Sequence, residues 1–283
     1  YDGSFTEARV LYYDPEQDFG FYQIDPADVG FELQAVALGS WRELAVGEEM
    51  LLIGNNEKEE YSIKYGTVTN LNVDKGTRYG SYIHSTYDRT GGSSGSPVWN
   101  TRGEVVAIHA SGTDTSSFEL PVDYLRTALE VVAAGQDVVR GDIGVDLDLI
   151  SIGEAIRHYG LPAEKAAEIG PSQTGGTPHV MQVDGAILTT PAVGLLRPGD
   201  IVYTADGQLL RDDLYTFDRI LAGTVGGSVE LGVYRNGEKT DISVPVYDLE
   251  GRKIRRFARF AGGIFHDVSI GLRHLVHMEA VGV

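Results

Sequence analysis

Residues 90–98 read Thr-Gly-Gly-Ser-Ser-Gly-Ser-Pro-Val, and this run decides how the chain around it is interpreted. Glycine at 92 lets a backbone N–H point to the place where a tetrahedral oxyanion would form. Ser94 is the candidate nucleophile, and its own N–H would be the second oxyanion donor. Gly95 leaves room for a substrate backbone, and Pro97 stiffens the start of a strand. The alternative is an ordinary turn, because runs rich in glycine and serine are common in loops.

Short β-like runs separated by turn residues surround this loop. They lie at 8–12, 19–24, 49–53, 63–68, 79–85 and 105–109. Regular spacing of this kind is typical of an antiparallel barrel or sandwich. The period changes at 121–134, where apolar residues recur every three or four positions and predict a helix that Gly135 ends. We therefore expect a mainly β domain over residues 1–135.

The rest of the chain predicts a mixed unit of strands and short helices over 139–249. Strands are expected at 143–145, 180–189, 228–235 and 239–247, helices at 151–159 and 214–221, and a loop at 163–178. Asn236-Gly237 is a strong hairpin signal between the last two strands. The run Gly-Gly-Ile-Phe-His-Asp at 262–267 is succeeded by a helix-like stretch, and this order parallels the run at 141–146 and its own succeeding helix. Residues 256–283 are therefore predicted to begin a second, truncated copy of the same module.

Composition excludes several classes of function. The chain carries 41 acidic and 23 basic residues, a formal charge of −18, which argues against nucleic acid or an anionic membrane surface as partner. No apolar run approaches the roughly 18 residues of a membrane span, so we expect no membrane insertion. The absence of cysteine excludes disulfides and thiolate chemistry and fits an oxidising compartment. His274 and His277 have helical spacing near His266, but no third ligand of matching spacing is evident, so no metal or cofactor is expected.

Three motifs resemble those of the HtrA family of serine proteases, in which a chymotrypsin-like domain is joined to PDZ domains. The first is the run at 90–98. The second is Tyr-Asp-Pro-Glu-Gln-Asp-Phe-Gly-Phe at 13–21, which is similar to the turn that holds the family's catalytic aspartate, here Asp18. The third is the pair Arg-Gly-Asp-Ile-Gly-Val at 140–145 and Gly-Leu-Leu-Arg-Pro-Gly-Asp-Ile-Val at 194–202. The spelling of these motifs is closest to the larger, duplicated HtrA-like proteases.

The resemblance implies a fold and a set of site residues. The fold would be a trypsin-like double β-barrel, incomplete at its N-terminus, followed by a PDZ-like α+β module at 139–249. Ser94 and Asp18 would be catalytic, and the N–H groups of Gly92 and Ser94 would form the oxyanion hole. The substrate pocket would be lined by Ile108, His109 and Ala110. The carboxylate-binding loop of the PDZ-like module would be Arg140, Gly141, Asp142, Ile143, Gly144 and Val145.

One departure from the family pattern affects the mechanism. The family's catalytic histidine precedes the aspartate by tens of residues, yet only 17 residues precede Asp18 and none is histidine. We therefore expect a piece of a longer protein, cut at both ends and nearly inactive by itself, rather than a degenerate protease. His109 is a poor replacement base, because its strand would place it on the wrong side of the nucleophile. Asp88 lies six residues before Ser94, the spacing at which trypsin-like enzymes place an acid that binds a basic substrate side chain, but we expect it to be solvated.

The expected function is ATP-independent serine endopeptidase activity on unfolded or misfolded proteins, as in protein quality control. The PDZ-like module would capture peptide C-termini by adding the peptide as a strand. The alternative is a catalytically inactive, protease-fold scaffold or chaperone that binds peptides. The family also suggests a homo-oligomer, located in the periplasm or cell envelope, with an intracellular site as the alternative.

Overall fold

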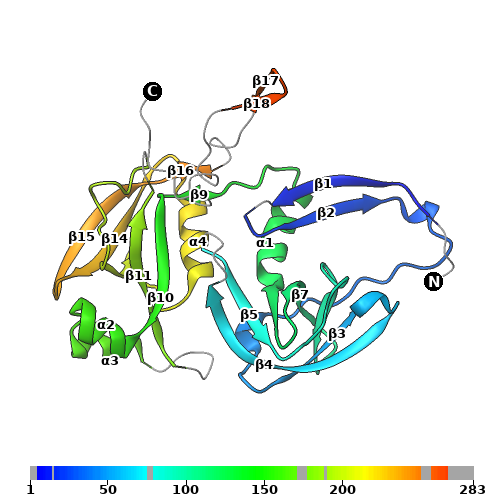
Figure 1. The fold of residues 1–283 in the computed structure, drawn as a ribbon, viewed down its shortest axis with the longest axis horizontal. Helices are drawn as coiled ribbons and strands as arrows, with labels where there is room; N and C mark the ends of the chain where they lie inside the picture. The colour runs from blue at the N-terminus through cyan, green and yellow to red at the C-terminus, as the bar shows by residue number, and fades with distance from the viewer. Residues whose placement is uncertain are drawn as a thin grey trace. The chain divides into compact units, whose positions relative to one another are not determined.

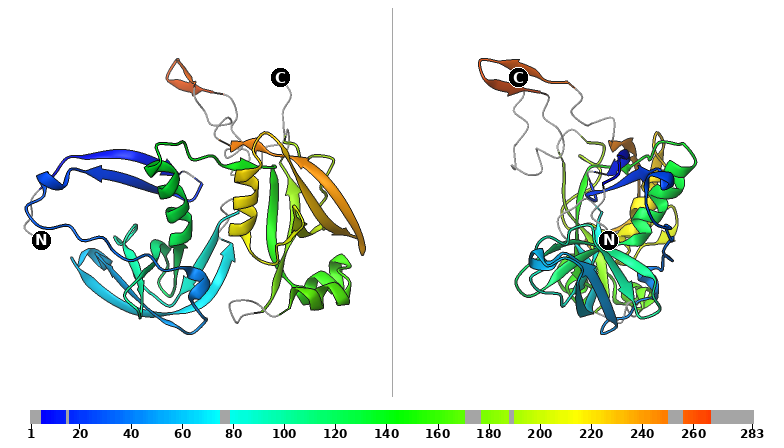
Figure 2. Two further views of the ribbon diagram at one scale, coloured as in Figure 1. Left: turned by 180° about the vertical axis from the view of Figure 1, so that it is seen from behind. Right: turned by 90° about the vertical axis from the view of Figure 1, so that its right-hand side faces the viewer.

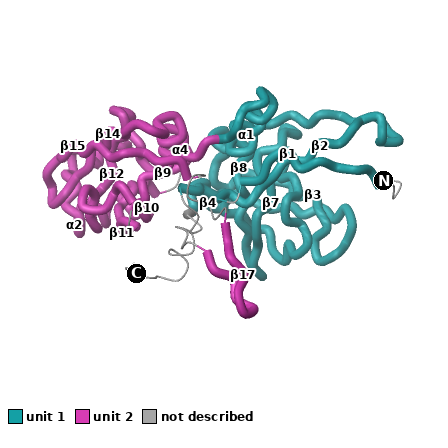
Figure 3. The backbone as a smooth tube through the Cα atoms, turned by 90° about the horizontal axis from the view of Figure 1, so that it is seen from above, with its two compact units in different colours: residues 1–138, 172–176 teal, residues 139–171, 177–283 magenta. Residues whose placement is uncertain are grey.

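The computed structural model describes residues 5–14, 16–74, 79–170, 177–187, 190–249 and 256–266. The chain divides into two compact units (Figure 3): residues 1–138 with 172–176, and residues 139–171 with 177–283. Most regular structure is β-strand, as the spacing of the short apolar runs predicted. None of the helices in the described residues is long and apolar enough to cross a bilayer.

Unit 1 is built around a closed barrel with the strand order β3-β4-β5-β8-β7-β6 (Figure 1). Its strands are β3 (Glu49–Gly54), β4 (Ser62–Asp74), β5 (Ser81–Ser85), β6 (Pro97–Asn100), β7 (Val105–Gly112) and β8 (Ser117–Pro121). All neighbouring pairs are antiparallel. Apolar side chains fill the barrel: Trp41, Leu44, Met50, Leu52, Val68, Leu71, Ile83, Tyr87, Val98, Val106 and Ala107. The barrel agrees with the trypsin-like part of the expected fold.

A hairpin and a helix complete unit 1. The hairpin pairs β1 (Ala8–Asp14) with β2 (Phe19–Ile24) and forms a separate two-stranded sheet. The helix α1 (Val122–Ala133) follows β8 directly, close to the predicted 121–134, and Gly135 beyond it has φ +70°. The buried Asp123 of α1 accepts hydrogen bonds from the Ser40 hydroxyl at 2.9 Å and from the Trp41 N–H at 3.1 Å. These bonds hold the segment before β3 against the helix.

Short 3-10 turns join the strands of unit 1 at Pro26–Asp28, Trp41–Glu43 and Asn56–Lys58. In the first, the Asp25 side chain accepts a hydrogen bond from the Ala27 N–H, and in the second Ser40 accepts one from the Arg42 N–H. The third, next to Gly54, reaches the loop between β5 and β6 and is described with the site.

Unit 2 contains an antiparallel sheet with the order β10-β11-β12-β14-β15, and β13 added to β12. Its strands are β10 (Val145–Ser151), β11 (His179–Ala186), β12 (Ile201–Ala205), β13 (Gln208–Leu209), β14 (Ser228–Arg235) and β15 (Glu238–Pro245). The short strands β9 (Gly141–Asp142) and β16 (Tyr247–Asp248) pair separately. Figures 1 and 2 show helix α4 (Leu214–Gly223) running alongside β10, which is an edge strand of the described sheet.

Two of the expectations for this unit were wrong. The strand predicted at 143–145 begins at Val145 and runs to Ser151, followed by α2 (Ile152–Tyr159). The predicted loop at 163–178 contains a helix, α3 (Ala163–Ile169). This helix forms because Ala166 and Ile169 pack into the core beside Leu161. The last described segment is a hairpin of β17 (Ala258–Phe260) and β18 (Gly263–Phe265), and the helix predicted after it lies outside the described residues.

Candidate functional site

The loop at 86–96 between β5 and β6 carries Ser94, whose side chain is exposed. Gly92 and Gly95 have φ +96° and +82°, which a residue with a Cβ rarely adopts. A Cβ on Gly92 would lie 2.8 Å from the Asn55 carbonyl oxygen, so space as well as φ demands glycine there. Within the described residues, the N–H groups of Gly92 and Ser94 donate no hydrogen bond. Two backbone donors therefore remain available on either side of Ser93.

The loop is tied to the turn after β3. Ser93 is fully buried, and its hydroxyl donates to Asn56 Oδ1 at 2.8 Å. Asn56 in turn donates through Nδ2 to the Ser62 hydroxyl at 2.6 Å. The Glu57 N–H donates to the Gly91 carbonyl at 2.8 Å. These bonds fix the residues that precede Ser94 to a turn that lies more than thirty residues earlier in the chain.

A second anchor comes from β7. The Gly95 N–H donates to the His109 carbonyl at 2.8 Å, and the His109 N–H donates to the Ser96 carbonyl at 2.9 Å. His109 itself is 2% exposed, and its Nδ1 lies 2.8 Å from Glu119 Oε2. The other oxygen of Glu119 accepts a hydrogen bond from the Ser85 hydroxyl at 2.8 Å. Sequence reasoning placed His109 near the nucleophile but missed its partner Glu119.

Asp18 lies in the turn of the β1–β2 hairpin, with an exposed side chain and φ +52°. The Tyr13 hydroxyl donates to its Oδ1 at 3.3 Å. Among the described residues no hydrogen bond joins Asp18 to Ser94, as expected of two residues that a histidine would bridge. The buried carboxylate of the turn is Asp14, which accepts hydrogen bonds from the Tyr12 hydroxyl at 2.8 Å and the Glu16 N–H at 3.0 Å. An aspartate that opens a turn and accepts from the backbone two residues on is a recognisable signal, but sequence reasoning did not use it.

Asp88, His84, Ile108 and Ala110 lie near the loop in sequence or on the adjacent strands β5 and β7. Asp88 is exposed and pairs with Lys64 Nζ at 2.9 Å, and this hydrogen bond lowers the pKa of the Asp88 carboxyl. His84 lies with Nδ1 2.8 Å from the Thr69 hydroxyl of the neighbouring strand. Ile108 and Ala110 are half-buried on either side of His109 in β7.

In unit 2, the segment 140–145 is tightly held. Arg140 donates to Asp218 Oδ2 of α4 at 2.7 Å, and both side chains are largely buried. The Gly144 N–H donates to Asp142 Oδ1 at 2.5 Å. The carbonyls of Ile143 and Gly144 accept from Ala192 and Ile187. The N–H of Gly144 and the guanidinium of Arg140, which were expected to receive a carboxylate, thus already have partners in the chain.

Gly141, Asp142, Ile143 and Val145, the other members of this loop, are buried. A Cβ on Gly141 would lie 2.0 Å from the Leu221 carbonyl oxygen of α4, so glycine lets the loop pass close to the helix. The loop at 140–145 therefore packs directly against α4, beside the edge strand β10.

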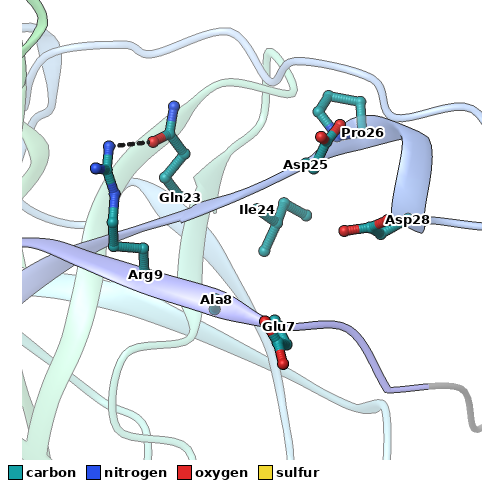
Figure 4. A pocket seen from close by; sticks show the side chains of 8 residues that line it. All are labelled: Glu7, Ala8, Arg9, Gln23, Ile24, Asp25, Pro26 and Asp28. Atoms are coloured by element: carbon teal, nitrogen blue, oxygen red, sulfur yellow. Dashed lines mark hydrogen bonds between the residues drawn. The ribbon is translucent and has the colours of Figure 1, made fainter.

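Among the described residues of unit 1, open hollows lie along the β1–β2 hairpin and over the barrel. The larger, of about 540 Å³, follows the β1–β2 hairpin (Figure 4) and is lined by Glu7, Ala8, Arg9, Gln23, Ile24, Asp25, Pro26 and Asp28. Arg9 donates to Gln23 across it at 2.7 Å. The other, of about 430 Å³, is apolar and lies over β3, β4 and β6, lined by residues such as Leu51, Tyr65 and Trp99. Within the described residues, His, Asp and Glu side chains form no group that would hold a metal ion, and His274 and His277 lie outside them.

Comparison with known proteins places these features in a family context. Residues 1–108 match the family described as a trypsin-like peptidase domain. The chain is 32% identical to the pro-apoptotic serine protease NMA111 of Coccidioides immitis, over 98% of this chain and 28% of that protein. It is 34% identical to the protein of the same name from Meyerozyma guilliermondii, over 93% of this chain and 27% of that protein. The chain thus spans little more than a quarter of the length of these relatives.

Solved structures agree in fold. The HtrA-type protease AlgW with a decapeptide has a TM-score of 0.57 and 23% identity, covering 87% of this chain and 73% of that one. AlgW with a tripeptide gives the same TM-score at 24% identity, covering 85% of this chain and 77% of that one. By these likenesses the chain is similar in sequence to serine proteases named NMA111, it shares the fold of HtrA-type proteases, and its N-terminal unit has a trypsin-like fold.

Proposed function

We propose that unit 1 carries the nucleophile of a serine endopeptidase of the HtrA type. Ser94 Oγ would attack the peptide carbonyl, and the N–H groups of Gly92 and Ser94 would donate to the oxyanion that forms. Asp18 would orient a histidine that takes the proton from Ser94 Oγ, and that histidine would come from outside these 283 residues. The observation that carries the proposal is the loop itself. Its two N–H groups are unused among the described residues, and Ser94 is exposed between two anchored segments.

We propose that unit 2 binds the C-termini of unfolded polypeptides. The boundaries we propose are a trypsin-like domain at 1–135, a PDZ-like domain at 139–249 and the start of a second one at 256–283. Support comes from the position of β10 at the sheet edge, where an extended peptide would add as a strand alongside α4. The AlgW structures were solved with a decapeptide and with a tripeptide, which supports peptide as the class of ligand. Because the Gly144 N–H is bonded to Asp142, an incoming carboxylate would have to displace that side chain.

Partners and location follow from the same proposal. The charge of −18 favours polypeptide over nucleic acid as the partner. A homo-oligomer remains the assembly that the family suggests. The two curated relatives named above are fungal, which gives no support to a periplasmic site, so an intracellular location is the one we propose.

A second candidate is a peptide-binding scaffold or chaperone that has kept the protease fold. One observation favours it. The histidine nearest the loop, His109, is buried and bonded to Glu119, so it is poorly placed to activate Ser94. In this case unit 2 would bind peptides while unit 1 cuts none.

Active-site labelling separates the two candidates. A fluorophosphonate reacts with an activated serine, so a form of the protein long enough to include the missing histidine should be labelled, and Ser94→Ala should abolish the label. Ser96→Ala, next but one in the loop, is the matched control and should label normally. A folded protein that is not labelled would favour the scaffold. Peptide-bond hydrolysis by the present 283 residues, lost in Ser94→Ala, would refute the need for an external histidine.

A further inference from the structure

A chain of buried polar groups crosses the barrel beneath the Ser94 loop. It joins Ser85 of β5, Glu119 of β8 and His109 of β7, and these strands are neighbours in the barrel. Ser85 and Glu119 are fully buried and His109 is 2% exposed. Both bonds measure 2.8 Å. An apolar barrel would be simpler to build, because a buried carboxylate costs stability unless it is paired.

The network fixes the side chain of His109. The Ser85 hydroxyl donates to one oxygen of Glu119, and a carboxylate can only accept, so His109 Nδ1 carries the proton that it donates to the other oxygen. Burial and the Glu119 charge raise the pKa of Tyr87, which therefore stays neutral beside the pair. Among the described residues, His109 is the one basic side chain within 4.0 Å of the Glu119 carboxylate.

Both ends of the Ser94 loop are attached to the strands that carry this network, β7 and β8. At the far end, the His109 backbone brackets the residues after Ser94 through its bonds to the Gly95 N–H and the Ser96 carbonyl. At the near end, the Ser117 hydroxyl, two residues before Glu119 on β8, donates to the Tyr87 carbonyl at 3.1 Å and lies 3.3 Å from the Thr90 hydroxyl. The side chain of Glu119 thus bonds the end of β5, which leads into the loop, and His109 of β7, whose backbone bonds the residues after Ser94.

We propose that Glu119 and His109 are positioning residues for the nucleophile loop: their buried pair holds the backbone on both sides of Ser94, and with it the two oxyanion donors, in register. The proposal rests on the proposed function in assigning Ser94 the role of nucleophile. It differs from a purely structural role, because weakening the pair should loosen this loop more than it weakens the barrel as a whole.

Amide hydrogen exchange tests the proposal without requiring activity. The reporter is the Gly95 N–H, and the reference is the Val68 N–H, which donates to the Glu48 carbonyl elsewhere in the same barrel. In Glu119→Leu, Gly95 exchange should rise at least about tenfold more than Val68 exchange, because a local opening exposes only the loop. Glu119→Gln, which keeps the shape and one acceptor, should give a smaller rise. Glu104→Gln is the control, since Glu104 is partly exposed in the turn between β6 and β7 and bonds Arg102 and Asn100.

Activity supplies the second readout. In a labelling-competent form of the protein, Glu119→Leu should slow fluorophosphonate labelling of Ser94 by about ten- to a hundredfold, because small displacements of a nucleophile are costly. Gly95 and Val68 exchange that rise in parallel in every variant would overturn the positioning role, even if the wild type labels. A wild type that never labels, with Gly95 exchange rising selectively, would leave the positioning role standing and refute the proposed protease. If Glu119→Leu does not fold, Glu119→Gln and Ser85→Ala give the same comparison.

Discussion

Gly144→Ala is the substitution whose cost the structure defines most sharply. Gly144 has φ +80°, and a Cβ built on it would lie 2.0 Å from Cβ and 2.1 Å from Oγ1 of Thr190. The hydroxyl of Thr190 has one proton, which it donates to the Ile187 carbonyl at 2.6 Å, with the Gly144 carbonyl a second acceptor at 3.1 Å. An added methyl group must therefore push Thr190 away and break this hydrogen bond.

The magnitude follows from two parts. A left-handed conformation costs a residue with a Cβ about 1–2 kcal/mol. Loss of the Thr190 hydrogen bond adds about 0.5–1.5 kcal/mol. We therefore expect Gly144→Ala to lower the free energy of unfolding of unit 2 by about 1.5–3.5 kcal/mol. Gly226→Ala isolates the first part, because Gly226 has φ +83° and open space where its Cβ would be.

The assay is hydrogen exchange of the most protected amides in the unit 2 sheet, which reports the unfolding free energy of that unit. Gly144→Ala should cost clearly more than Gly226→Ala. In a Thr190→Gly background, the cost of Gly144→Ala should shrink to that of Gly226→Ala, because the clashing atoms are gone. Equal costs for the two glycines in the wild-type background would refute the reasoning.

Two further predictions concern unit 2. Arg235 donates to both oxygens of the buried Asp200 carboxylate, at 2.6 and 2.7 Å. We expect Asp200→Asn to lower the free energy of unfolding of unit 2 by about 3 kcal/mol, measured by the same hydrogen exchange. Asp241→Asn, at the exposed pair with Lys239, is the control and should change it little. Burial and a hydrogen bond to Glu168 raise the pKa of Tyr203 to about 12. Because unfolded tyrosine loses its proton first, stability should fall as the pH rises from 10.0 to about 12. Chemical denaturation across this range should show no such component in Tyr203→Phe, and an unchanged fall there would contradict the assignment.

The barrel strands β3, β4, β5 and β7 were predicted because they are short apolar runs bounded by turn residues, whereas β8 (Ser117–Pro121) was not among the expected strands. Helix α3 was not predicted, because it contains few large apolar residues and depends on packing by Ala166 and Ile169. The strand predicted at 143–145 was centred on Gly144. The strand instead begins at Val145, and its alternation of Asp146 and Asp148 with apolar neighbours was the signal for it. Local pattern thus identified elements with their own periodicity and missed those that tertiary contacts stabilise.

The candidate site divides in the same way. Ser94 could be picked out as a candidate because Gly92 and Gly95 beside it permit positive φ angles, and this requirement is visible in a short stretch of sequence. Its supports were not, because Asn56 and Glu119 are distant in sequence and neither has a local signal that names its partner. A glutamate between two apolar residues of a strand gives no indication that a histidine ten residues earlier lies opposite it.

The arrangement of the site also explains why part of a catalytic apparatus can be built without the rest. Orientation of the Gly92 and Ser94 N–H groups depends on the loop and on bonds to Asn56 and His109, all of which unit 1 supplies. Activation of Ser94 depends instead on a base, and the carboxylate proposed to orient that base, Asp18, is exposed on a separate hairpin where the Tyr13 hydroxyl donates to it. Orientation of the N–H groups is achieved by backbone packing inside one barrel. Activation of Ser94 needs, in addition, a histidine side chain that reaches from the Asp18 hairpin to the barrel. If the proposed roles hold, a base added to this chain should find the proposed oxyanion donors, the N–H groups of Gly92 and Ser94, already oriented, and the rate it gives should be limited by how firmly Asp18 holds it.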